Sequence, residues 1–243
     1  MDSTFIILTL AALLTSILSG TIGMGGGILL LAVMAQYFPL AVLIPLHGII
    51  QLFSNTSRVI YSYKYFQKHI VIHFAIGAIL GAVIGSQVVL VIPDTIYKII
   101  LGFFIISLTF IRSPKFKVKS QFKWISVGGV STFLGILLGA TGPLIAPFYL
   151  SENLRKDVLV ATKAACQIFT HLFKVITFFM IGFAIGPHLP ILAVMTAMVF
   201  LGNYIGKLLL HQVSDKWFLW IFQGAIVCLS VRMIFQGFLV LSK

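Results

Sequence analysis

Long apolar runs alternate with short polar or Pro- and Gly-containing breaks along the whole chain. The breaks divide it into apolar segments at 3–20, 22–38, 41–63, 70–92 and 95–112, and again at 123–138, 142–150, 157–182, 187–210 and 216–241. Most of these segments are long enough to cross a hydrocarbon layer of about 30 Å as helices. The pattern predicts an all-α polytopic integral membrane protein with about eight membrane segments.

Composition supports this prediction. Hydrophobic residues make up 60% of the 243 residues and charged residues 9%, more apolar surface than a soluble chain of this length can bury. Residues 5–18 resemble the core of a signal peptide, but no Lys or Arg precedes them and the apolar pattern continues beyond Gly20, so we expect them to belong to the fold. We expect Cys166 and Cys228, both in apolar text, to be packing residues without a disulfide.

The net charge of +12 comes from Lys and Arg in short segments between the apolar runs. This distribution is typical of cytoplasmic loops under the positive-inside rule and argues against a nucleic-acid-binding face. Because helical bundles and not barrels are indicated, we expect a multi-pass protein of the cell membrane, a bacterial inner membrane or its equivalent.

The two groups of segments match each other. Adding 116 to first-half numbers aligns identical residues, and a slip of five residues restores the match further on; the aligned pairs include Gly23 with Gly139, Gly26 with Gly142, Gln51 with Gln167, Gly81 with Gly202 and Asp94 with Asp215. Internal duplication is the usual construction of secondary transporters. We predict two transmembrane repeats, 1–112 and 123–243, joined by a basic cytoplasmic linker at 113–122.

Two segments, 22–38 and 142–150, are short for a full crossing and fit re-entrant segments. If each repeat starts with a re-entrant pair and continues with three crossings, the repeats are inverted. With the linker inside, this topology also places six basic residues inside: Lys64, Lys68, Arg155, Lys156, Lys207 and Lys216. Parallel repeats of four spans would export three of them, so we prefer the inverted arrangement.

Glycine clusters mark equivalent points of the two repeats. Gly23, Gly25, Gly26 and Gly27 place four glycines in five residues, each costing a helix roughly 1 kcal/mol relative to Ala. Their counterpart is Gly139-Ala-Thr141-Gly142-Pro143. We predict helix breaks at mid-membrane depth, where exposed backbone N–H groups can bind an anion. Close helix packing by small residues is the alternative.

The third segment of each half carries a polar stripe on one helical face: His47, Gln51, Asn55 and Arg58 in the first, and Lys163, Gln167, His171 and Lys174 in the second. Basic and amide groups without a carboxylate suit an anionic substrate. Two alternatives stay open here: Arg58 and Lys174 could snorkel to an interface, and the two glutamines could join helices.

These residues support a family resemblance. Gly23-Met-Gly-Gly-Gly-Ile-Leu-Leu, the weaker Gly139-Ala-Thr-Gly-Pro-Leu-Ile-Ala-Pro147 and the basic central linker resemble the sulfite exporter TauE/SafE family of membrane permeases over the whole chain. The chain departs from the family pattern at Leu31, where a proline is usual, and at Thr141 and Pro143, where glycines are. The resemblance implies a transporter of roughly eight segments in two repeats for sulfite, sulfonates and related anions.

We therefore expect a secondary carrier or uniporter for a small anion, with an anion channel or a non-transporting assembly or sensor protein as alternatives. The predicted substrate-binding residues are Gly23, Gly25, Gly26, Gly27, Gln51, Asn55, Gly139, Thr141, Gly142, Lys163, Gln167 and His171. Proton coupling would need His47 or His171. No catalytic spacing, metal-binding cluster or nucleotide motif is present, so we expect neither an enzyme nor a cofactor. The particular anion, the driving force and the oligomeric state are open at this point.

Overall fold

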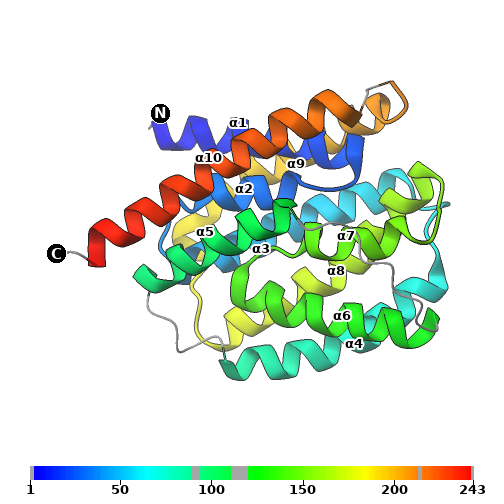
Figure 1. The fold of residues 1–243 in the computed structure, drawn as a ribbon, viewed down its shortest axis with the longest axis horizontal. Coiled ribbons are helices and arrows are strands. Elements are labelled where there is room, and N and C mark those ends of the chain that lie inside the picture. Colours follow the sequence, from blue (N-terminus) through cyan, green and yellow to red (C-terminus); the bar gives the residue numbers. More distant parts are fainter. Residues whose placement is uncertain (1–2, 89–93, 111–119, 213–214, 242–243) are drawn as a thin grey trace.

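The computed structural model describes residues 3–88, 94–110, 120–212 and 215–241, which are helical with short connections and contain no strand (Figure 1). The helices are α1 (Ser3–Ile22), α2 (Gly26–Met34), α3 (Leu40–Tyr61), α4 (Lys68–Val88), α5 (Asp94–Phe110), α6 (Ser120–Leu138), α7 (Gly142–Leu150), α8 (Lys156–Met180), the 3₁₀ turn η2 (Gly186–His188), α9 (Leu189–Leu209) and α10 (Asp215–Leu241). Most of the predicted linker at 113–122 lies outside the described residues, and 120–122 begin α6.

Within the described residues, six helical stretches are long and apolar enough to cross a membrane: Ser3–Ile22, Leu40–Tyr61, Lys68–Val88, Gln121–Leu138, Lys156–Met180 and Gly186–Leu209. Their outer faces expose large apolar side chains such as Leu14 and Val83, which suits a lipid environment. The chain is therefore a polytopic helical membrane protein. By contrast, α2 and α7 have nine residues each and extend only about 14 Å, so neither can cross alone.

The bounds of the helices repeat along the chain. Adding 116 to the bounds of α2, residues 26 and 34, gives 142 and 150, the bounds of α7. Adding 121 to the bounds of α4, residues 68 and 88, gives 189 and 209, the bounds of α9. The offset found among the residues thus also holds for the helices that they form.

The two halves are interlocked. The first helix of each half packs along the fourth helix of the other, α1 on α9 and α6 on α4, while α3 lies against α8 and α5 against α10 (Figure 1). Glycines allow the close approach: a side chain at Gly202 would meet the backbone of α1, and one at Gly81 would meet the backbone of α6. In Figure 1, α1 and α6 run in opposite directions across the bundle.

The short helix α2 lies inside the bundle. Leu30, Leu31, Ala32 and Met34 have no exposed surface, and they pack with Ile44 and Ile136 in one apolar core. Non-helical backbone at membrane depth is tolerated only where protein or a water-filled cavity surrounds it. Burial of α2 therefore shelters the polar connection that precedes it.

Candidate functional site

Both predicted helix breaks are present. The helix α1 ends at Ile22 and α2 begins at Gly26, while α6 ends at Leu138 and α7 begins at Gly142. Gly23 and Gly139 occupy equivalent positions and have φ angles of 80° and 86°, in the left-handed region that glycine adopts without steric cost. Each N–H donates to a carbonyl one turn back, on Ser19 and Gly135, so the preceding helix ends in the same way in both halves.

The two breaks leave two helix N-termini without side-chain caps. Gly25 is the N-cap of α2 and Thr141 the N-cap of α7, and neither makes a side-chain capping hydrogen bond. The N–H groups of a first helical turn have no intrahelical partner and carry partial positive charge. Each N-terminus can therefore offer hydrogen bonds to an anion.

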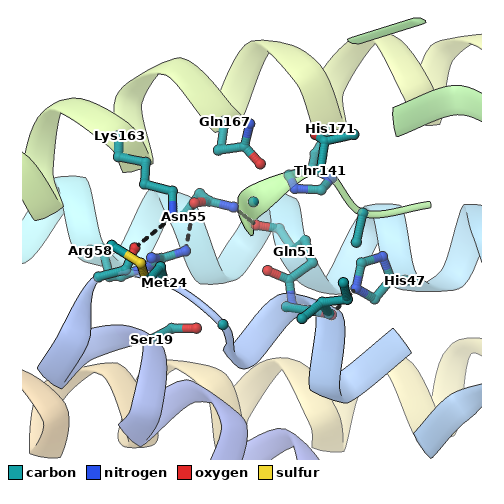
Figure 2. Close-up of a pocket in the computed structure, with 16 residues that line it drawn as sticks. Ser19, Met24, His47, Gln51, Asn55, Arg58, Thr141, Lys163, Gln167 and His171 are labelled. Carbon is teal, nitrogen blue, oxygen red and sulfur yellow. Dashed lines mark hydrogen bonds between the residues drawn. The ribbon is translucent and has the colours of Figure 1, made fainter. Parts of the chain in front are cut away.

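Both N-termini border one cavity, which lies between α1, α2, α3, α7 and α8 (Figure 2). The space open to the centre of a water molecule is about 30 Å³, enough for about two waters or a small ion. The lining residues are Ser19, Gly23, Met24, Gly25, Gly27, Ile28, His47, Gln51, Asn55, Arg58, Ala140, Thr141, Gly142, Lys163, Gln167 and His171.

Of the twelve predicted binding residues, ten line this cavity and two, Gly26 and Gly139, lie beside it. Gly26 faces α1, where a side chain would meet the Thr15 carbonyl. The Gly139 carbonyl accepts a hydrogen bond from Lys174 Nζ at 2.7 Å. These two glycines shape the breaks from behind the cavity wall.

Among the described residues, Lys163 and Arg58 bring cationic side chains to the cavity wall, and no Asp or Glu lines it. Lys163 is 3% exposed, and its Nζ donates to the Gly23 carbonyl at 3.1 Å. Arg58 is 7% exposed; it donates from Nε to the Ser54 carbonyl at 3.3 Å and from Nη2 to Asn55 Oδ1 at 2.5 Å. The ion pairs found among the described residues involve neither cation. Burying two such charges costs free energy that an anionic ligand would offset.

The neutral polar side chains are held in place around these charges. Asn55 Nδ2 donates to the Gln51 carbonyl at 2.7 Å, which leaves its Oδ1 for Arg58. Gln167 Nε2 lies 3.4 Å from Ser131 Oγ, and this hydroxyl is 2.9 Å from Thr141 Oγ1. Gln167 thus joins α8 to α6 and also lines the cavity.

His47, His171 and Lys174 form a basic cluster at one end of the cavity. Lys174 Nζ donates to the Gly139 carbonyl and lies 3.5 Å from His47 Nδ1, while His47 Nε2 lies 2.8 Å from the Gly27 carbonyl. A proton on Nε2 of His47 satisfies both contacts, since Nδ1 then accepts and Nε2 donates. The rings of His47 and His171 meet edge to face with centroids 6.1 Å apart, and His171 Nδ1 is buried without a hydrogen-bond partner.

The snorkelling alternative for Arg58 and Lys174 is wrong. Both side chains are buried, with Lys174 at 0% exposure, because α3 and α8 lie against each other and are flanked by α9 and α4. His47 and Arg58 line the cavity but were not among the predicted binding residues, and their places on the polar stripe were the signal that could have included them. Ser19, Met24, Ile28 and Ala140 complete the wall and carried no such signal.

The model of the family described as sulfite exporter TauE/SafE matches residues 8–233, which include both breaks and both polar stripes. Comparisons with curated proteins and with solved structures give no match.

Proposed function

The chain belongs to the sulfite exporter TauE/SafE family, and from this membership together with the central cavity we propose that it is a carrier for a small sulfur-containing anion such as sulfite or a simple sulfonate. Members of this family transport sulfur anions across membranes, and this chain is a multi-pass protein of the cell membrane. The proposal adds the size of the substrate, the residues that bind it and the carrier mechanism.

The observation that carries the proposal is the pairing of two uncapped helix N-termini with Lys163 and Arg58 in a cavity whose lining, in the described part of the chain, contains no carboxylate. Oxyanions are bound in proteins by backbone N–H groups at helix N-termini and by charge-assisted hydrogen bonds. A cation would meet two positive charges and two positive dipole ends here. The site therefore favours an oxyanion over a cation by its charge and over a neutral solute by its donors.

The role that each residue has in anion binding follows from its position in the cavity wall. The N–H groups of Gly25, Gly27 and Gly142 donate to the anion oxygens, and Lys163 supplies charge next to Gly142, where a side chain would lie 3.9 Å from Nζ. Gln51, Asn55, Thr141, Gln167 and His171 complete the donor set. The small cavity admits sulfite or a short sulfonate more readily than a bulky organic anion.

Inverted repeats are part of the proposal. The opposite directions of α1 and α6 and the repeated helix bounds support them. They give each end of the bundle an equivalent set of helices, so that one site can be reached in turn from either side. A carrier of this kind can use the membrane potential alone, which is worth about 2.3 kcal/mol per charge at 100 mV.

Flux measurements test the proposal. Purified protein in proteoliposomes at set membrane potentials is offered radiolabelled sulfite, then methanesulfonate and then acetate as a carboxylate. We expect saturable sulfite flux that is stimulated by sulfite on the opposite side, as for a carrier, and is strongly reduced in Lys163→Ala and Gln167→Ala. Folded wild-type protein that moves none of these anions would refute the proposed function, and flux that does not saturate would indicate a channel.

A further inference from the structure

A second, smaller cavity lies next to the central one, and Arg58 borders both. This outer cavity has about 10 Å³ open to the centre of a water molecule, room for about one water. It is formed where α1, α3 and α9 end and α8 begins, and its polar lining includes Ser62, Asn203 and Lys207. We call this end of the bundle the basic end, because Lys64, Arg155, Lys156 and Lys207 lie on it.

Arg58 is placed to contact an ion in either cavity. Two hydrogen bonds hold the side chain to its own helix through the Ser54 carbonyl and Asn55. A guanidinium has five N–H donors, so most of its donors remain for the cavities. Asn203 Nδ2 fixes the neighbouring wall: it lies 2.9 to 3.0 Å from the Ser54 carbonyl, Ser54 Oγ and Ser57 Oγ, which share its two N–H groups.

Four of the equivalent positions at the opposite end carry buried apolar side chains. The offsets of 116 and 121 place Ile136 at the position of Gly20, Ile44 at that of Val160, Phe178 at that of Ser62 and Ala82 at that of Asn203. All four are apolar and buried, and Ile44 and Ile136 have no exposed surface. Lys174, the counterpart of Arg58, is held by the Gly139 carbonyl and has no exposed surface.

We propose that the outer cavity is the route by which an anion reaches the central site from the basic end, with Lys207 as the first contact and Arg58 as the junction. This inference rests on the proposed function for the identity of the anion, and on the two cavities for the route. At the opposite end Ile44, Ala82, Ile136 and Phe178 are buried at the positions equivalent to the outer cavity, and Lys174 is the counterpart of Arg58.

Cysteine labelling tests the route without reference to a substrate. In a Cys228→Ser background, which leaves only the buried Cys166, Ser62→Cys and its counterpart Phe178→Cys are reconstituted into nanodiscs and exposed to a charged, membrane-impermeant thiol reagent. Because thiol reactivity follows exposure, we expect Ser62→Cys to react at least about tenfold faster. Equal rates, or faster reaction at Phe178→Cys, would overturn the proposal.

A second experiment tests Lys207 with sulfite. A positive charge at the entrance of the outer cavity raises the rate at which an anion enters. Lys207→Gln is therefore expected to lower the initial flux at low sulfite concentration by about 3- to 10-fold. The Kd for sulfite should stay within about twofold of the wild-type value. Lys207→Arg should restore the flux, and Lys64→Gln, at the same end but outside both cavities, should leave it unchanged. Equal losses for Lys64→Gln and Lys207→Gln would contradict the route. If wild-type protein neither binds nor carries sulfite, the proposed function fails and the labelling result still decides the route.

Discussion

Replacing Lys163 by Met separates binding from folding, because the two effects are expected to have opposite signs. The ammonium is buried in the cavity wall without a carboxylate partner, so it costs free energy in the empty protein. Met keeps the length and removes the charge. The variant loses the hydrogen bond to the Gly23 carbonyl, but this oxygen borders the cavity, where water can replace the donor.

The expected loss of sulfite affinity follows from the hydrogen bond between Lys163 and the anion, which the variant cannot make. A hydrogen bond between an ion and a charged donor contributes about 1.5 to 3 kcal/mol. With about 1.4 kcal/mol per factor of ten, sulfite should bind roughly 12- to 140-fold more weakly to Lys163→Met. The Tm of the empty protein should stay the same or rise, since the desolvated charge is gone.

The assay measures sulfite affinity by calorimetry and Tm by scanning fluorimetry on the same detergent-solubilised samples. Lys123→Met is the matched control, because Lys123 is also buried but does not line the central cavity. Its Nζ donates to Glu152 Oε1 at 2.7 Å. This control should lower Tm and leave the affinity for sulfite unchanged. Wild-type affinity together with a lowered Tm in Lys163→Met would refute the reasoning, since Lys163 would then serve only to hold the break at Gly23.

Three further substitutions test the packing around the site. Gly26→Ala would drive a side chain into the backbone of α1 and should abolish folded protein on size-exclusion chromatography, whereas Gly186→Ala, with nothing within 4 Å, should elute as wild type. Gly77→Ala would meet a backbone carbonyl of α6 and should lower Tm far more than Gly129→Ala, whose side chain fits at 3.4 Å; equal Tm values would contradict the packing. Asn203→Leu removes an amide whose two N–H groups donate to α3, worth about 1 kcal/mol each, and should lower Tm measurably; an unchanged Tm would mean that α9 is held by its apolar contacts alone.

The breaks and the polar stripes could be predicted because their residues are costly in a membrane. Four glycines in five residues oppose a continuous helix, and a charge such as Lys163 opposes contact with lipid. This free-energy cost depends on the residue type alone, so it can be recognised in the sequence before the packing partners of a helix are known. The same reasoning located ten of the residues that line the cavity.

Helix partners and side-chain directions could not be predicted in this way. Nothing in α1 alone indicates that α9 is its main neighbour, since the glycine face of α9 and the small residues of α1 become complementary only after both are placed. Likewise, Gly26 and Gly27 differ by about 100° of helical rotation, so one packs on α1 and the other faces Gln51 in the cavity. The cluster showed that a break was present but not the phase of the helix that follows it.

The interlocked halves also determine the order of assembly during synthesis. Ser3 and Leu189 are 186 residues apart, so at about 5 to 20 residues per second α1 waits roughly 10 to 40 s for the helix that covers it. In that interval Ser16 and Thr21, which are buried against Gly202 and Gly206 of α9 in the finished bundle, face lipid or the insertion machinery. If translation stalls before α9 is made, the polar face of α1 therefore stays exposed in the membrane. Cellular quality control can recognise the incomplete chain by this exposed face.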